Sequence, residues 1–165
     1  MIRSVVTLPD HGLAQRAEPV GEIDDIARSV ARDLLDTMRA SSHSVGIAAP
    51  QIGVAMRVFA LDVTGHRKAQ SCHGEVVVFD PEIVDADGRE VGREGCMSVP
   101  DLTGDVARAT RVLVRGIGLD GKVCELACDA FEARAVQHEI DHLDGRLFLD
   151  RVVGAERVYR RRVYR

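Results

Sequence analysis

The chain has 165 residues, 45% of them hydrophobic and 29% charged, which is typical of one globular domain with a core of ordinary size. A net charge of −4 and the absence of tryptophan argue against a surface built mainly to bind nucleic acid or anionic lipid. No apolar run is long enough for a membrane helix, and the start lacks the apolar block of a signal peptide. We therefore expect a single cytoplasmic domain over residues 1–165, whose four cysteines are thiols or metal ligands rather than disulfides.

The first predicted element is a helix over residues 24–40. Asp24 or Asp25 can cap its N-terminus, because a carboxylate there accepts hydrogen bonds from free backbone N–H groups. Apolar side chains recur at helical spacing and predict one buried face: Ile26, Val30, Leu34, Leu35 and Met38.

Short runs typical of β-strands follow at residues 56–62, 76–80, 82–85, 89–93, 111–115 and 122–128. Asp87-Gly88 and Asp120-Gly121 lie between such runs and predict hairpin turns, since glycine adopts the positive φ that these turns require. The polar segment 63–75 is expected to be a loop.

From about Ala130 the apolar spacing becomes helical again, and Gly145 is typical of a helix end. The side chains that predict this second helix are Phe131, Ala135, Val136, Ile140 and Leu143. Strands in the middle with a helix toward each end favour an α+β fold, with helices packed on antiparallel sheet.

The second helix contains QHEIDHLDG at residues 137–145. His138 and His142 lie one turn apart, so both imidazoles can reach one ion, and Glu139 can reach a water on that ion. This H-E-x-x-H arrangement is typical of metal-dependent hydrolases. The alternative is a solvated helix face, which the flanking apolar residues disfavour.

A third metal ligand has to come from elsewhere in the chain. No histidine follows His142, and the only later glutamate is Glu156, beyond the expected helix end. Upstream, Cys96 lies in EGCMSVP at residues 94–100, where a thiolate would complete a Cys-His-His site with one open position. A lone cysteine is more often a small buried hydrophobe, but the glycine and polar neighbours of Cys96 favour the ligand.

The pair Cys124 and Cys128 has a spacing that can suggest zinc. Strand alternation puts both on one face together with Leu126, and no second ligand pair is near in sequence, so we predict core packing.

A third segment, SVGIAAPQIG at residues 44–53, contains small residues that let backbone approach a ligand closely. The amide of Gln51 could donate to a developing oxyanion. Taken alone, this segment is better explained as a tight loop in which Gln51 is simply hydrogen-bonded to backbone.

The three segments together, in this order, resemble the motifs of the peptide deformylase family, and the resemblance extends over nearly the whole chain. It implies antiparallel sheets packed around a central C-terminal metal-binding helix, with an N-terminal helix. It also implies removal of the N-formyl group from the formylmethionine of nascent polypeptides, with release of formate.

The resemblance assigns roles to individual positions. Cys96, His138 and His142 would hold a divalent metal, natively Fe²⁺, which Ni²⁺, Co²⁺ or Zn²⁺ can replace. Glu139 would be the general base, and Gln51 and the Met97 N–H would hold the oxyanion. The residues implied in substrate binding are Val45, Gly46 and Gly95 for the peptide backbone, and Phe131, Arg134 and Ala135 for the methionine side chain.

This sequence departs from the family pattern at three positions. Ser44 replaces a glycine and would narrow or polarise the mouth of the pocket, while Met97 replaces a leucine of similar size. Thr103 stands where many members have arginine, a change that concerns the charge pairing of Glu94 rather than the chemistry.

Two alternatives from other classes remain at this point. A general metallopeptidase could use the same helix and would accept a free N-terminus. A ribosome-associated RNA-binding protein could use the basic tail at residues 156–165, which carries about +4. For the tail, a solvated or packed terminal helix is the simpler expectation.

Overall fold

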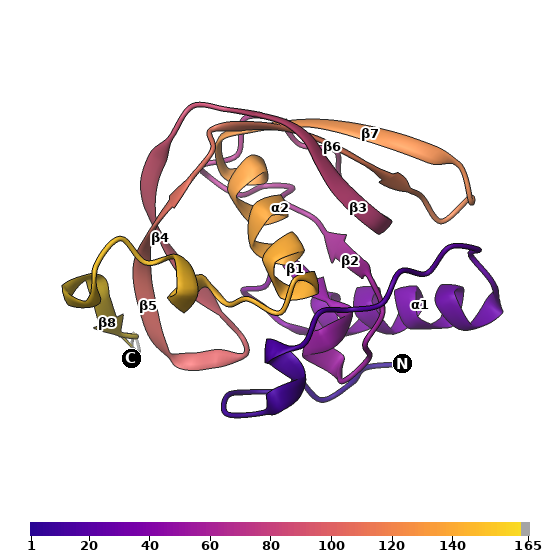
Figure 1. Ribbon diagram of the computed structural model, residues 1–165, viewed down its shortest axis with the longest axis horizontal. Coiled ribbons are helices and arrows are strands. Elements are labelled where there is room, and N and C mark those ends of the chain that lie inside the picture. The colour runs from indigo at the N-terminus through magenta and orange to yellow at the C-terminus, as the bar shows by residue number, and fades with distance from the viewer. Residues whose placement is uncertain (163–165) are drawn as a thin grey trace.

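The computed structural model describes residues 1–162 and confirms the α+β fold with antiparallel sheets. Helix α2 (Ala130–Leu143) lies at the centre, with strands on two sides of it and helix α1 (Asp25–Ala40) below the sheet in the view of Figure 1. Short 3-10 turns occupy His11–Ala14, Ala49–Ile52, Phe148–Arg151 and Ala155–Arg157. Neither α1 nor α2 is long and apolar enough to cross a membrane, nor is any other helix within residues 1–162.

The described strands form two sheets in which all neighbours are antiparallel. The five-stranded sheet has the order β1 (Gly46–Ala48), β2 (Val58–Leu61), β3 (Val76–Asp87), β6 (Arg111–Ile117) and β7 (Val123–Asp129). The three-stranded sheet has the order β4 (Glu90–Cys96), β5 (Val99–Arg108) and β8 (Val158–Arg160). Helix α2 follows β7 directly and packs its apolar side against the five-stranded sheet.

Helix α1 begins and packs much as the sequence predicts. The Asp24 carboxylate caps its N-terminus by accepting from the Ala27 N–H at 2.8 Å. Leu34, Leu35 and Met38 are buried, but Ile26 is 68% exposed, so its place on the buried face was predicted wrongly. The face is completed instead by small residues, including Ala27, which let the helix lie close to the sheet.

The strand predictions err where proline and polar residues break the pattern. The runs at 76–80 and 82–85 are one strand, β3, because register shifts between Phe79 and Glu82 accommodate Pro81, which has no N–H to donate. Strand β5 was missed. Its polar side chains obscure the alternation, and it is held by pairing with β4 on one side and β8 on the other.

One of the two predicted hairpin turns is correct. Asp120-Gly121 joins the paired strands β6 and β7, with the Gly118 N–H donating to the Lys122 carbonyl at 2.9 Å. Asp87-Gly88 does not form a hairpin turn, because β3 and β4 belong to different sheets. Gly88 has φ 74° and carries the chain from one sheet to the other.

The basic tail is not the terminal helix expected from the sequence. Residues 158–160 form β8, which lies beside β5 with Tyr159 opposite Thr103. The last part of the tail, residues 163–165, lies outside the described residues.

Candidate metal centre and active site

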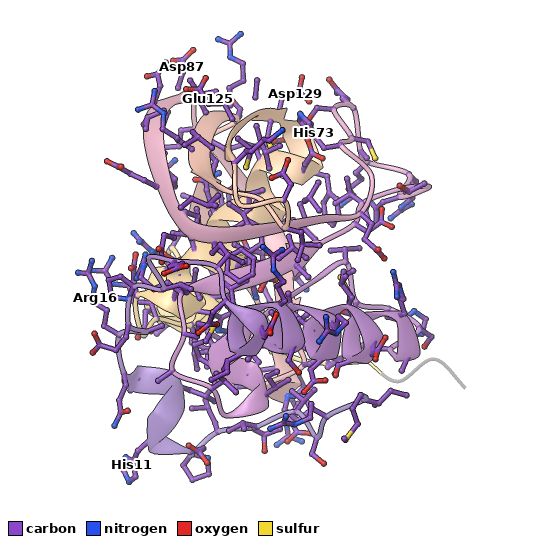
Figure 2. The ribbon with its side chains drawn as sticks, turned by 90° about the vertical axis from the view of Figure 1, so that its right-hand side faces the viewer. His11, Arg16, His73, Asp87, Glu125 and Asp129 are labelled. Carbon is purple, nitrogen blue, oxygen red and sulfur yellow. The ribbon has the colours of Figure 1, made fainter. Side chains whose placement is uncertain are left out.

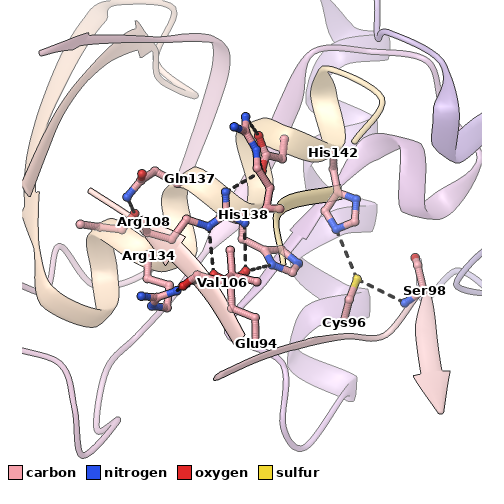
Figure 3. A network of polar contacts seen from close by, with 12 residues as sticks. Glu94, Cys96, Ser98, Val106, Arg108, Arg134, Gln137, His138 and His142 are labelled. Atoms are coloured by element: carbon pink, nitrogen blue, oxygen red, sulfur yellow. Dashed lines mark hydrogen bonds and ion pairs between the residues drawn. The ribbon is translucent and has the colours of Figure 1, made fainter. Parts of the chain in front are cut away.

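Three side chains predicted as metal ligands meet at one point. The Sγ of Cys96 and one ring nitrogen each from His138 and His142 all lie within 4.8 Å of one another. The Cys96 Sγ is 3.3 Å from Nε2 of His142 (Figure 3). Cys96 and His142 are buried, and His138 is partly so.

Local structure explains how each of the three arrives there. On α2 the spacing of four residues puts the two imidazoles one turn apart, with ring centroids 5.0 Å from each other. Cys96 is the last residue of β4, and the register against β5 shifts between Gly95 and Cys96. This irregularity ends the regular hairpin pairing at the residue that faces α2.

The carboxylate of Glu94 orients one of the two imidazoles. It lies 2.8 Å from Nδ1 of His138 and receives two hydrogen bonds of 2.9 Å from Arg108. Arg134 adds a third cation contact at 2.8 Å (Figure 3). Burial acts to raise the pKa of Glu94, but the bonds from His138 and Arg108 outweigh it, so the pKa lies well below its usual range. Glu94 is therefore fully paired although Thr103 carries no charge.

Arg108 links this carboxylate to helix α2. Its Nη1 lies 2.5 Å from the Asp141 carboxylate, which also binds Arg151 at 2.9 Å. The Arg108 side chain is 4% exposed, so its charge depends on these two carboxylates for compensation. Nothing in the sequence singles out Arg108, because its partners lie 14 and 33 residues away.

The carboxyl group of Glu139 is buried beside the three candidate ligands. Within residues 1–162 its Oε2 has no hydrogen-bond partner, and burial raises its pKa to about 7. Gly46 of β1 lies directly against it. A buried carboxylate oxygen without a partner is costly unless a water or ligand completes it.

These observations fit a resident divalent metal. One thiolate and two imidazoles form a donor set that suits soft or borderline divalent ions and leaves a coordination position open. The Glu94 contact to Nδ1 of His138 leaves Nε2 of that ring for an ion. Glu139 lies next to the same point without being needed as a ligand.

The side-chain amide of Gln51 faces the same centre. Its Oε1 accepts from the Ala48 N–H at 3.0 Å, which fixes the orientation of the amide. Its Nε2 lies 3.4 Å from the Cys96 Sγ and 3.2 Å from the Ser98 hydroxyl. Gln51 is 2% exposed, so this donor is held inside the protein and aimed at the candidate metal site.

A cleft of about 680 Å³ opens onto these groups. The structure brings nearly all the site residues expected from the sequence to its lining: Val45, Gly46, Gln51, Gly95, Cys96, Met97, Phe131, Arg134, Ala135, His138 and Glu139. His142 lies behind Cys96, with which it is in contact. A volume of this size suits a small ligand or the end of a peptide.

The sequence did not reveal that His66 forms part of this lining. Its ring stacks on Phe131 with centroids 3.6 Å apart and an interplanar angle of 5°. Burial lowers the pKa of His66, and the charges of Lys68 and Arg67 add to this effect, which favours the neutral ring. The only available signal was its place in a polar loop, which indicates no partner.

The loop that carries His66 is anchored by Glu132 at the start of α2. This carboxylate accepts from the Ser71 hydroxyl at 2.7 Å and from the His73 N–H at 2.8 Å. The Ser71 N–H also donates to Asp129 at 2.8 Å, and Figure 2 shows His73 and Asp129 at the same end of the molecule. Glu132 thereby fixes one wall of the cleft from outside it.

His73, Glu132 and Cys128 form a second group of potential metal ligands. Sequence motifs do not suggest this group, because the spacing of Cys128 points only to Cys124 as a partner. Cys128 is buried in the core, as predicted, and burial raises its pKa well above the ordinary value of a thiol. The hydrogen bonds from Ser71 and His73 already satisfy Glu132, so we interpret the group as the anchor of the loop.

Comparisons with known proteins agree on one family. The family model described as polypeptide deformylase matches residues 2–158. A peptide deformylase of Thermomicrobium roseum is 41% identical over 152 residues, covering 92% of this chain and 86% of that protein. The crystal structure of peptide deformylase from Ehrlichia chaffeensis has a TM-score of 0.88 at 31% identity, covering 94% of this chain and 90% of that one. A Met-Ala-Ser-bound peptide deformylase from Acinetobacter baumannii has a TM-score of 0.81 at 32% identity, covering 92% and 99%.

Proposed function

Because the chain belongs to the polypeptide deformylase family, whose members are metal-dependent enzymes that remove the formyl group from N-terminal formylmethionine, we propose that the cleft over α2 is where this chain does so. The observation that supports this site is the meeting of Cys96, His138 and His142 within 4.8 Å. No other group of residues within 1–162 combines such a ligand set with a cleft and an unpartnered carboxylate.

We propose that the formyl end of the substrate lies innermost in the cleft. Val45 and Gly46 at the edge of β1, and Gly95 at the edge of β4, would align the peptide backbone as an added strand. The methionine side chain would enter the pocket lined by Phe131, Arg134 and Ala135. The A. baumannii protein with bound Met-Ala-Ser supports a peptide of this kind as ligand.

Glu139 is the proposed general base. Its carboxylate takes a proton from the attacking water and passes it to the departing amine nitrogen, so that formate and a free N-terminus leave. The Gln51 amide and the Met97 N–H donate to the oxygen that becomes negative during attack. Removing one such donor commonly lowers the rate by about 10²–10³.

A divalent metal held by Cys96, His138 and His142 would supply Lewis acidity and lower the pKa of the attacking water. We propose Fe²⁺ as the native metal, with Ni²⁺, Co²⁺ or Zn²⁺ as replacements in purified protein. The soft Cys96 thiolate supports this proposal, because a thiolate suits Fe²⁺ as a ligand. The thiolate and Fe²⁺ also make the site sensitive to oxidation. An iron form that lost activity in air no faster than a nickel form would contradict the assignment.

The test of the proposed function is formate release by protein purified without oxygen. Three peptides are compared: one that begins with formylmethionine, one that begins with free methionine, and one cleavable only at an internal bond. We expect turnover of the first alone. Cleavage of either of the others at a comparable rate would favour the general metallopeptidase instead.

Exposed arginines near the C-terminus support a further proposal, contact with ribosomal RNA through residues 156–165 where nascent chains emerge in the cytoplasm. Deleting the tail would also remove β8 from β5, so charge substitutions are the better test. Changing Arg160 and Arg162 to glutamine should weaken salt-sensitive ribosome binding while small peptides are still deformylated. Unchanged binding would remove the idea.

A further inference from the structure

Arg161, which immediately follows β8, contributes to the cleft from the C-terminal end of the chain. Its N–H donates to the Asp101 carbonyl at 2.8 Å, and its Nη2 lies 3.4 Å from the Cys96 carbonyl. Its exposed side chain is part of the cleft lining. It lies outside residues 2–158, the part of the chain that the family model matches.

The position of Arg161 follows from how β8 is held. Tyr159 pairs with Thr103 in the sheet, and its hydroxyl donates to Asp105 at 2.9 Å. The guanidinium of Arg93 packs over the Tyr159 ring at 3.8 Å from its centroid. These contacts fix the strand two residues before Arg161, so the backbone at β8 places Arg161 at the cleft.

The guanidinium of Arg161 lies directly over Gly95. A Cβ at Gly95 would stand 2.5 Å from Nη2 of Arg161 and 3.4 Å from Cγ2 of Thr103. The bare Cα of Gly95 and the small side chain of Thr103 therefore leave the space that the guanidinium occupies. Gly95 is also a residue we propose to align the substrate backbone, so the cation lies beside the path of the peptide.

Arg161 differs in its charge pairing from the other arginines of the cleft. Arg93 is paired with Asp105 at 2.9 Å, and Arg134 is paired with Glu94 at 2.8 Å. Within residues 1–162 no carboxylate lies within ion-pair distance of Arg161. A guanidinium has five N–H donors, and the contact to the Cys96 carbonyl occupies one nitrogen.

We propose that Arg161 binds a carboxylate of the substrate peptide beyond the formylmethionine, so that this chain favours formylmethionyl peptides with an acidic residue at the second or third position. The inference rests on the proposed substrate orientation. A carboxylate is the group that a guanidinium binds with two parallel hydrogen bonds. The free C-terminus of a short peptide offers the same chemistry and has to be tested separately.

The experiment compares the kcat and KM of formate release for amidated peptides. The pairs are formyl-Met-Asp-Ser-amide with formyl-Met-Asn-Ser-amide, and formyl-Met-Ala-Asp-amide with formyl-Met-Ala-Asn-amide. The wild-type protein should favour the acidic member of at least one pair about fivefold, mainly through KM, as expected for a partly exposed charged contact. Formyl-Met-Ala-Ser with a free or amidated C-terminus then shows whether a terminal carboxylate is bound as well.

The Arg161→Ala variant should lose this preference with kcat on the amide substrates nearly unchanged, and Arg161→Lys should keep part of it. The matched control is Arg160→Ala, which removes the same charge one residue earlier, from a position that does not line the cleft. The inference is overturned if Arg161→Ala keeps the wild-type preference, or if Arg160→Ala loses it equally. Absence of formate release by the wild-type protein would instead contradict the proposed function.

Discussion

The carboxylate of Glu139 lies against the bare Cα of Gly46, and a Cβ at that glycine would stand 2.6 Å from Oε1. The two residues come from different elements, α2 and β1, so their contact depends on how the helix packs on the sheet. The missing side chain of Gly46 therefore leaves the space that the carboxylate of Glu139, the proposed base, occupies.

Gly46→Ala should lower kcat for formate release about 10²-fold, because the added methyl group has to displace the carboxylate or the strand edge. Gly118→Ala is the matched control, since its Cβ would meet the flexible Asp120 side chain at 3.1 Å and the Lys122 carbonyl oxygen at an ordinary 3.8 Å. Wild-type kcat in Gly46→Ala would show that the position of Glu139 tolerates more movement than the contact implies.

Glu139→Gln keeps the shape of the side chain and removes its ability to accept a proton. We expect kcat to fall by about 10²–10⁴ while the metal content of the purified protein stays the same. Glu125→Gln, which alters an exposed pair with Arg115, serves as control. Equal turnover in the Glu139→Gln protein would exclude this residue as the base.

Cys96→Ser should weaken metal retention about tenfold or more, since a hydroxyl is a poor substitute for a thiolate toward a soft ion. Metal analysis after gel filtration measures this directly. Cys124→Ser, at the margin of the core, should retain the metal. Full metal occupancy in the Cys96→Ser protein would mean that this sulfur is not a ligand.

Arg108→Met tests the buried ion network. It removes the buried cation that Glu94 and Asp141 share, so that each keeps only its contact to Arg134 or Arg151, and it should lower the free energy of unfolding by about 3–5 kcal/mol. Urea denaturation measures the loss. Arg111→Met breaks an exposed pair with Asp87 and should change stability by less than about 0.5 kcal/mol. Similar small losses in both variants would contradict the structural importance of the network.

Glu132→Gln tests the loop anchor through pH. Burial acts to raise the pKa of Glu132, but the hydrogen bonds from Ser71 and His73 outweigh it, so the folded pKa lies below the ordinary 4.5. The charged form is thus favoured by folding, and the stabilisation is fully present above pH 4.5. It is lost as pH falls through the folded pKa.

The free energy of unfolding should therefore differ between wild type and Glu132→Gln by about 2 kcal/mol at pH 7, and the difference should shrink below pH 4.5. Denaturation at several pH values measures it. A difference that stayed constant into the acid range would show that Glu132 acts through shape rather than charge. Because the loop carries His66, we also expect a higher KM for formylmethionyl peptides.

Whether a site residue can be predicted from the sequence depends on how far along the chain its partners lie. His138 and His142 are recognisable together because a single helix fixes their separation. Cys96 and Gln51 come from other segments. The local sequence around each residue does not establish its role, which is predicted only when the three motifs are taken together. Arg108, His66 and Arg161 were missed for the same reason, because each acquires its role only from partners placed by tertiary packing.

The fold shows a similar division. Helices α1 and α2 were predicted because the spacing of their apolar residues indicates one buried face on each helix. Strand β5 was missed because neighbours on both edges, rather than an alternating pattern, keep it extended. The path at Gly88 was predicted wrongly because a glycine with positive φ indicates a change of direction but not which strand follows as a partner.

The register shift between Gly95 and Cys96 limits which insertions and deletions this chain can accept during evolution. A one-residue insertion or deletion between β4 and β5 would turn the sulfur to the opposite face of the hairpin and away from both rings. Residues 119–121, at the tip of the hairpin between β6 and β7, are exposed and do not line the cleft, so this turn can tolerate insertions and deletions. The β6–β7 hairpin should therefore tolerate insertions in its connection far better than the β4–β5 hairpin, although both connections are short.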